Sequence, residues 1–336
     1  MYGRIVVPLD GSARAERALP IAARLARAPG GSVLLLHVVP SPIGMMQQGT
    51  TSTTRPQAAP DAAVTGVAGA SGYLERLAAS ELLAGIATES EVIIGVPAEA
   101  IIAATRSSGA DILVLCSHGY TGMTRQVLGS VAEKVAFYAP IPVLVLREGG
   151  PQPDAEHGLR VLAALDGSTR AEEVLAPAAY ITEALAPPAR GAMHLIRVVP
   201  PAADQQEGGR EANVILLQQA SSYLDATVDR LRKGPLAPLL AGLLPLNSSV
   251  ALEADVAFAI MQAAEHDEEA ARADMAERCT IVAMATHGLS GTGRWVMGSI
   301  TARILKASRL PLLIIRPPDI MELSDFTWDQ AQLFPV

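Results

Sequence analysis

The chain has 336 residues, of which 50% are hydrophobic and 18% charged, so it can form well-packed cores and is not a disordered polymer. At roughly 150 residues per domain, this length predicts about two domains. A formal net charge of −8 and an aromatic content of 4% exclude a basic, base-stacking groove for nucleic acid.

Signals for disulfides, export and membrane insertion are weak. Cys116 and Cys279 lie far apart and make no metal pattern or disulfide framework, so a reducing cytosol is the default expectation. Asp10 interrupts the N-terminus before a signal-like apolar segment can form. No uncharged apolar run approaches the roughly 18 residues that a membrane span needs. We therefore expect a cytoplasmic protein that binds neither membranes nor nucleic acid.

The sequence contains an internal repeat. RIVVPLDGSARAERAL, starting at Arg4, returns as RVLAALDGSTRAEEVL from Arg160. SHGYTGMTRQVLGSVAEKV, starting at Ser117, returns as THGLSGTGRWVMGSITARI from Thr286. Insertions fall only between matched blocks, which indicates a duplicated domain. We predict domains at 1–148 and 159–317, a Pro/Gly-rich linker at 149–158 and a tail at 318–336.

Short β-branched runs alternate with Ala-rich stretches in each copy. In the first copy we predict, in chain order, strand 4–9, helix 13–27, strand 33–39, helix 73–84, strand 91–95, helix 98–107, strand 112–116, helix 130–138 and strand 143–147. The apolar runs do not alternate strictly, which suits parallel strands that are buried on both faces. This order predicts a doubly wound α/β domain with right-handed crossovers.

Three segments depart from the simple pattern. Pro20 in the first helix, and Pro177 near the matched position, should each kink their helix or end its first segment, and we expect a kink. Residues 40–72 are rich in Thr, Gln, Ala and Pro, so we expect a mobile loop there, with a shorter counterpart at 200–209. The third helical region of the second copy should be longer, over 255–277.

The residues that could carry chemistry fall at carboxyl ends of predicted strands, where open parallel sheets bind ligands. An aspartate follows strand one of each copy, and a glycine-serine step opens the helix after strand four. Backbone amides at such a helix start can bind phosphate. Alternatively, the serines act only as N-caps of ordinary turns. These residues are Asp10, Gly129 and Ser130, matched by Asp166, Gly298 and Ser299.

Each half resembles the universal stress protein family, whose ATP-binding members have G-x₂-G-x₉-G-(S/T) between strand four and helix four. The spacing is kept from Cys116 through Gly119 to Gly129-Ser130, and from Ala285 through Gly288 to Gly298-Ser299. Cys116 and Ala285 replace the first glycine of the pattern. The resemblance implies a five-stranded parallel sheet of order 3-2-1-4-5 in each half, with the halves paired through their last strands.

The resemblance also implies a binding site in each half. Asp10 and Asp166 would bind the ribose hydroxyls, while Val38 and Val198 would flank the adenine. The phosphates would lie against Gly119, Gly129, Ser130, Val131, Gly288, Gly298, Ser299 and Ile300. Strand-end residues complete the sites: Pro8, Leu9, Leu115, Cys116, Ala164, Leu165, Met284 and Ala285. The implied cofactor is ATP, with or without Mg²⁺.

Other conspicuous residues have competing interpretations. His118 and His287 could act as bases, but a loop hydrogen-bonding role is favoured because neither has an evident acidic partner in the sequence. Arg125 and Arg294 could reach a γ-phosphate or pair on the surface. Cys116 is interpreted as a small buried hydrophobe rather than a redox sensor.

The sequence has no Walker lysine, nucleophile elbow or zinc motif, so it favours ATP binding over turnover. We expect a stress-response regulatory module in which two domains form an intramolecular pseudo-dimer, with a homodimer and an unidentified protein partner as further expectations. A nucleotide-free interaction module and a slow ATP hydrolase stay as alternatives.

Two further expectations concern the second copy and the tail. The second copy lacks the Gly95-Val96-Pro97 step, so if only one half binds nucleotide, we expect the first. The tail contains Phe326, Trp328 and Phe334, which predicts docking on a groove of this chain or of a partner subunit.

Overall fold

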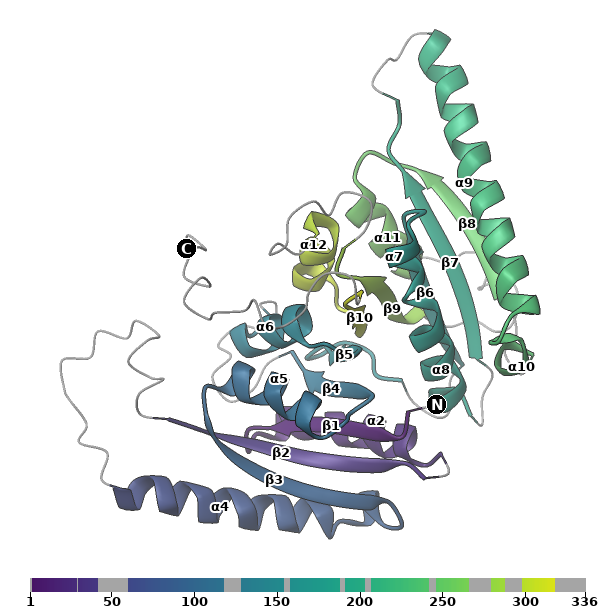
Figure 1. The fold of residues 1–336 in the computed structure, drawn as a ribbon. Coiled ribbons are helices and arrows are strands. Elements are labelled where there is room, and N and C mark those ends of the chain that lie inside the picture. Colours follow the sequence, from purple (N-terminus) through teal and green to yellow (C-terminus); the bar gives the residue numbers. More distant parts are fainter. Residues whose placement is uncertain are drawn as a thin grey trace, which may run out of the picture.

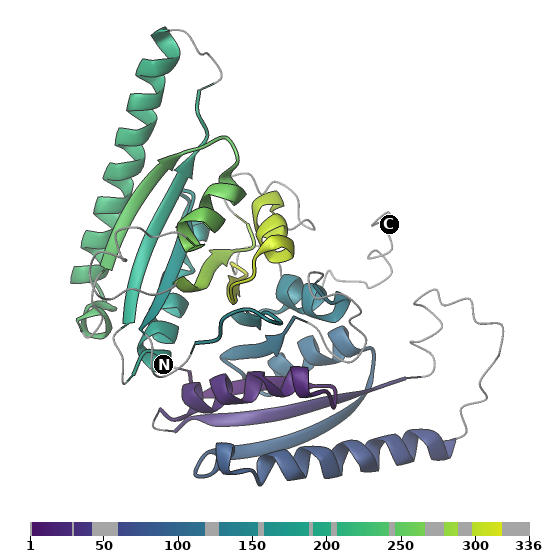
Figure 2. The ribbon, with the colours of Figure 1, turned by 180° about the vertical axis from the view of Figure 1, so that it is seen from behind.

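The computed structural model describes residues 2–28, 30–41, 60–117, 128–153, 158–187, 191–202, 207–241, 246–265, 279–287 and 298–317. They form a 10-stranded sheet with helices on both faces. Figures 1 and 2 show the two halves at opposite ends of this sheet, which runs through the junction between them.

The strand order confirms the predicted fold in both halves. The first half has the parallel order β3-β2-β1-β4-β5, from β1 (Arg4–Leu9), β2 (Ser32–Pro40), β3 (Ala87–Gly95), β4 (Ile112–Cys116) and β5 (Val143–Leu146). The second half mirrors it as β10-β9-β6-β7-β8, from β6 (Leu159–Leu165), β7 (Gly191–Val199), β8 (Leu246–Leu252), β9 (Cys279–Ala285) and β10 (Leu312–Ile315). Each half therefore has the order 3-2-1-4-5.

The last strands join the halves, as the resemblance implied. β5 and β10 pair antiparallel, with Val143 opposite Ile314 and Val145 opposite Leu312. Two hydrophobic cores, one on each face of the sheet, both contain residues of both halves. The halves are therefore joined by a shared sheet and shared cores as well as by the chain between them.

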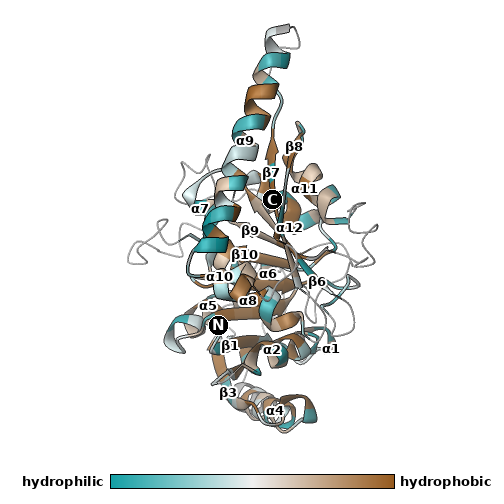
Figure 3. Ribbon diagram, turned by 90° about the vertical axis from the view of Figure 1, so that its right-hand side faces the viewer, coloured by the Kyte–Doolittle hydropathy of each residue, from teal (hydrophilic) through white to brown (hydrophobic). Residues whose placement is uncertain are grey.

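Helices cover both faces of the sheet. In the first half they are α1 (Ala13–Glu16), α2 (Ala18–Ala26), α4 (Pro60–Ala78), the 3₁₀ turn η1 (Glu81–Leu83), α5 (Pro97–Ser107) and α6 (Ser130–Tyr138). In the second they are α7 (Thr169–Glu172), α8 (Leu175–Leu185), α9 (Glu207–Lys233), α10 (Ala237–Leu240), α11 (Val256–Glu265) and α12 (Ser299–Ala307). One core lies under α2, α4, α8 and α9, and the other under α5, α6, α11 and α12. Figure 3 shows hydrophobic colour gathered on the strands between these layers.

The expected loop over residues 40–72 is only partly correct. Residues 42–59 lie outside the described ranges, but α4 begins at Pro60 and continues to Ala78. Ala70 and Leu74 of this helix are buried, and a Cβ on its Gly66 would lie 3.4 Å from Val39 Cγ1 in β2. The helix predicted over 73–84 therefore begins earlier, at Pro60, and ends at Ala78, with η1 after it. Packing against the sheet stabilises the first part of α4, which the composition alone did not indicate.

The long helix α9 also replaces part of an expected loop, because it begins at Glu207 within the predicted 200–209 segment. Ala220, Leu224 and Val228 are buried at a spacing of four residues, which turns one stripe of the helix towards the sheet. Figure 3 shows hydrophilic bands along α9. Over the described ranges, the structure contains no helix that is both long and apolar enough for a membrane span.

The prolines in the first helix of each half produce a break rather than the expected kink. α1 ends at Glu16 and α2 begins at Ala18, so Pro20 lies in the first turn of α2. Pro177 occupies the same place in α8. The first turn of a helix has no internal partner for its N–H groups, so proline is tolerated there.

Two arginines connect the last strand of each half to the last helix of the other. Arg147, next to the end of β5, is 6% exposed and donates to the carbonyls of Leu305 (3.1 Å) and Lys306 (3.4 Å) in α12. Arg316, next to the end of β10, donates to the carbonyl of Tyr138 in α6 at 3.1 Å. Carbonyls at a helix C-terminus attract cations, so these contacts stabilise the junction.

Candidate functional site

Each half has a cavity at the carboxyl ends of its parallel strands. The first measures about 400 Å³ and lies where the chain leaves β1, β2 and β4. The second measures about 390 Å³ and lies at the matched ends of β6, β7 and β9. Strand order reverses between β1 and β4, and between β6 and β9, which is where doubly wound sheets bind ligands.

The structure brings together nearly every site residue that the sequence singled out. The first cavity is lined by Pro8, Leu9, Asp10, Val38, Leu115, Cys116, Gly129, Ser130 and Val131. The second is lined by the matched Ala164, Leu165, Asp166, Val198, Met284, Ala285, Gly298, Ser299 and Ile300. Gly119 and Gly288 lie outside the described residues.

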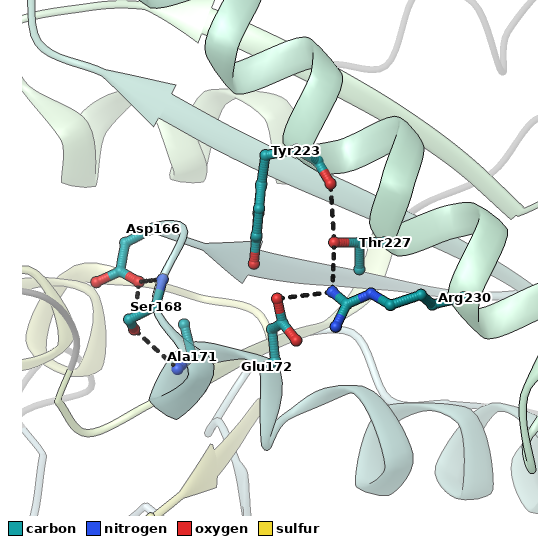
Figure 4. Close-up of polar contacts among 7 residues, drawn as sticks. All are labelled: Asp166, Ser168, Ala171, Glu172, Tyr223, Thr227 and Arg230. Carbon is teal, nitrogen blue, oxygen red and sulfur yellow. Dashed lines mark hydrogen bonds and ion pairs between the residues drawn. The ribbon is translucent and has the colours of Figure 1, made fainter.

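An Asp-Gly-Ser turn fixes one wall of each cavity. Figure 4 shows the contacts of Asp166, Ser168 and Ala171 in the second half. Asp166 Oδ1 accepts from the Ser168 backbone N–H at 2.9 Å and hydroxyl at 2.6 Å, and Ser168 Oγ accepts from Ala171 N at 3.1 Å. Gly167 has φ +95°, which glycine adopts without strain. The first half repeats this turn with Asp10, Gly11, Ser12 and Ala15. The turn therefore holds each carboxylate in a defined orientation at the cavity.

The opposite wall of each cavity is the start of a helix. Gly129 is the N-cap of α6 and Gly298 that of α12, and no side chain caps either helix. Ser130 and Ser299 are the first helical residues and are exposed, so the N-cap role considered for these serines is wrong. A Cβ on Gly298 would lie only 3.1 Å from the carbonyl oxygen of Thr286, a close approach that favours glycine.

Cys116 and Ala285 stand where the family pattern has its first glycine. Burial raises the pKa of the Cys116 thiol to about 12, and its sulfur lies 3.9 Å from the carbonyl oxygen of Ala15. The thiol is therefore protonated at neutral pH, which agrees with an unreactive residue. Cys116 is only partly buried, whereas Ala285 is buried.

The cavities also contain residues that sequence reasoning missed. His37 and Arg197 immediately precede the predicted Val38 and Val198. Ile101 and Ile260 line the two cavities from the matched helices α5 and α11. Neighbouring strand residues point to opposite faces, so a motif that marks Val38 gives no sign that His37 also reaches the cavity. The internal repeat is the signal that could have located them, because these residues occupy corresponding places in the two copies.

A tyrosine lies against the strand-two residue in each half. Tyr73 meets His37 edge to face with ring centroids 6.1 Å apart, and its hydroxyl donates to Glu16 at 3.0 Å. Burial lowers the pKa of His37, because it disfavours the charged imidazolium. In the second half, the guanidinium of Arg197 lies 5.0 Å from the ring centroid of Tyr223.

Beside Tyr223, the second half carries a polar cluster on α7 and α9 (Figure 4). Arg230 Nη2 donates to Glu172 Oε1 at 2.8 Å and to Thr227 Oγ1 at 3.0 Å. Burial is the largest cause that raises the pKa of Tyr223, followed by Glu172. Glu172, Thr227 and Arg230 line a separate cavity of about 360 Å³ and do not line the Asp166 site.

His287 lies at the wall of the second cavity. It is 5% exposed, and its Nδ1 lies 3.0 Å from Thr286 Oγ1, in line with a hydrogen-bonding role. Its ring centroid is 6.3 Å from that of Phe137, a residue of α6 in the first half. His118, Arg125 and Arg294 lie outside the described residues, as do the aromatic residues of the tail.

Comparisons with known proteins agree with the duplicated architecture. A model of the universal stress protein family matches residues 1–147 and 159–316. A universal stress protein of Methanocaldococcus jannaschii is 31% identical over 153 residues, covering 44% of this chain and 84% of that protein. One from Mycolicibacterium smegmatis is 24% identical over 326 residues, covering 94% of this chain and 97% of that protein. The crystal structure of an Archaeoglobus fulgidus universal stress protein is similar with a TM-score of 0.59 at 17% identity, covering 94% of this chain and 98% of that one.

Proposed function

Because this chain belongs to the universal stress protein family, we propose that it binds ATP in its two edge cavities and acts as a regulatory module. The observation that carries the proposal is the matched pair of cavities, each with an oriented aspartate on one wall and an uncapped helix start on the other. Volumes of about 400 and 390 Å³ fall within the range of small-molecule sites.

The helix starts would bind the phosphates. The first N–H groups of a helix have no partner inside it, and the positive end of the helix dipole favours an anion. The N–H groups of Gly129 and Gly298 donate to the carbonyls of Ser117 and Thr286. No side chain caps the helical residues that follow, so their amides are the ones that would bind a ligand. The hydroxyls of Ser130 and Ser299 add further donors.

The aspartates would bind the ribose. Asp10 and Asp166 can accept hydrogen bonds from sugar hydroxyls, while the apolar Val38 and Val198 offer a surface for the base. Among the described residues there is no group of three or more His, Cys, Asp and Glu side chains that could hold a metal ion. Mg²⁺ would therefore be bound chiefly by the nucleotide phosphates, as is usual for this ion.

Substitution of the exposed serines by glutamate tests this assignment. A carboxylate at Ser130 or Ser299 should weaken ATP binding at that cavity by roughly 10-fold or more, about 1.4 kcal/mol, because it competes for the helix start and repels phosphate. Titration calorimetry with ATP on the full chain would measure both sites. The same substitution places a carboxylate in the first turn of a helix, so the Tm without ligand should not fall.

Ser130→Ala and Ser299→Ala are the matched controls, and should weaken binding far less than glutamate. ATP binding unchanged in the Ser130→Glu/Ser299→Glu double variant would place the ligand elsewhere. Absence of saturable ATP binding in the unsubstituted chain would favour the nucleotide-free interaction module. For the regulatory part, ATP should change the oligomeric state or the protease cleavage pattern of the unsubstituted chain but not of the double variant.

A further inference from the structure

The two cavities differ in charge at the wall that carries the aspartate. Near its carboxyl end, strand two carries His37 in the first half and Arg197 in the second. Each residue lines its cavity together with Asp10 or Asp166. Most other pairs that line the cavities are alike in charge, from the aspartates themselves to the glycine-serine steps. The two cavities therefore differ chemically at the end nearest the aspartate, where only the second has an arginine from strand two.

Arg197 is held in place by its surroundings. Its guanidinium lies over the ring of Tyr223, with Cζ 5.0 Å from the ring centroid, in a cation–π contact. Its nitrogens also cover Gly167, since a Cβ on that glycine would lie 2.8 Å from Nη2 and 3.1 Å from Nη1. Gly167 directly follows Asp166, so the guanidinium lies beside the turn that orients the carboxylate.

His37 gives the first cavity a different wall. It lies edge to face with Tyr73, and burial lowers its pKa, so the imidazole is uncharged near neutral pH. A phosphate on the ribose would meet the carboxylate of Asp10 without a fixed cation from this strand position. In the second cavity, the guanidinium of Arg197 can offset Asp166 and offer paired donors to phosphate oxygens.

We propose that Arg197 makes the second cavity selective for adenosine nucleotides that carry a phosphate on the ribose 2′ or 3′ oxygen, whereas the first cavity prefers an unsubstituted ribose. This inference rests on the proposed nucleotide function. The same chemistry separates dinucleotide sites in other folds, where an acidic residue binds a ribose hydroxyl and a nearby arginine accommodates a ribose phosphate.

The test compares three probes by titration calorimetry: adenosine 5′-monophosphate and the 2′,5′- and 3′,5′-bisphosphates of adenosine. Ser130→Glu leaves the second cavity open, and Ser299→Glu leaves the first. With the second cavity open, at least one bisphosphate should bind about 10-fold more tightly than the monophosphate, which corresponds to about 1.4 kcal/mol. With the first cavity open, both bisphosphates should bind more weakly than the monophosphate.

Exchanging the two residues gives the sharpest result. Arg197→His should abolish the bisphosphate preference of the second cavity, and His37→Arg should raise bisphosphate affinity in the first. Arg197→Lys keeps the charge and should retain part of the preference, which separates charge recognition from loss of packing on Tyr223. Arg230→Gln removes one positive charge from α9 outside the cavity, and should leave the preference unchanged.

The outcomes separate this inference from the proposed function. Equal bisphosphate-to-monophosphate ratios in both cavities, or a preference that survives Arg197→His, would overturn the role of Arg197 while leaving nucleotide binding intact. Absence of binding by ATP and by all three probes would instead overturn the proposed function, and this inference with it.

Discussion

The two halves share the backbone features that we propose bind the nucleotide, and they differ in one side chain at the cavity wall. Both have the Asp-Gly-Ser turn, a small residue at the end of strand four and a glycine N-cap before the last helix. They differ at His37 and Arg197, which lie on the same wall of otherwise similar cavities. Features set by backbone geometry tolerate little change: a Cβ on Gly298 would lie 3.1 Å from Thr286 O, so any side chain there requires the backbone to shift. The residue at the position of His37 and Arg197 can change without altering this backbone, so we expect ligand specificity to differ there between the halves.

The junction between the halves is also unequal, and this inequality gives the largest expected effect. Arg147 is buried and serves two carbonyls of α12, whereas Arg316 is less buried and donates to one carbonyl of α6. Arg147→Met should lower the free energy of unfolding by roughly 3 kcal/mol, because it leaves two carbonyls without their charged donor. Arg316→Met should cost about 1 kcal/mol.

Urea unfolding of both variants measures this difference. Arg147→Lys is the control, since it keeps the charge but not the planar fork, and its loss should lie between those of wild type and Arg147→Met. If the free energy of unfolding fell equally in both methionine variants, the two arginines would contribute equally to the stability of the junction.

A second asymmetry crosses the junction through α6. This helix starts at the first cavity with Ser130, and Phe137 in its last turn lies near His287, a wall residue of the second cavity. Its counterpart at the end of α12 is Lys306, which pairs with Glu133 at 3.6 Å. Phe137→Leu should therefore cost about 1 kcal/mol in stability and weaken ATP binding at the second cavity more than at the first.

Calorimetry on Phe137→Leu, combined with Ser130→Glu or with Ser299→Glu, resolves the two cavities. Phe137→Tyr keeps the ring and should behave like the wild type at both. Equal weakening of the two cavities by Phe137→Leu would show that the substitution acts on the whole fold rather than through His287.

The sequence predicted most of the framework because the relevant signals are local or repeated. β1, β4 and α6 have the predicted bounds, since each is a short apolar or helical run with a clear turn signal on either side. The two halves were recognisable because matched blocks such as those around Asp10 and Asp166 kept their internal spacing. That same spacing located the strand ends that converge on the cavities.

The elements that were missed depend on tertiary contacts. The first turns of α4 contain glycine and threonine, and a helix forms there in the context of β2 and β3, as the close approach of Gly66 to Val39 illustrates. Pro20 alone did not specify that the first helix would be interrupted at Arg17, between α1 and α2. Likewise, no motif placed Phe137 beside His287, because their contact exists only once β5 and β10 pair.

The smallest expected effect is a pH dependence confined to the first half. Burial lowers the pKa of His37 below its unfolded value of about 6.5, although the charge of Asp10 opposes the shift. The unfolded chain therefore binds this proton more readily, so its stabilising contribution is complete above about pH 6.5 and is lost as the pH falls towards the folded pKa.

His37→Gln should remove this contribution, so the free energy of unfolding should fall less between pH 7.5 and pH 5.5 than in the wild type. Arg197→Gln is the matched control: it replaces the corresponding strand-two residue of the second half and leaves His37 in place, so the slope with pH should not change. Urea unfolding at the two pH values measures both slopes. A wild-type slope in His37→Gln would mean that other groups produce the acid sensitivity, and that the strand-two residues differ in charge without a consequence for folding.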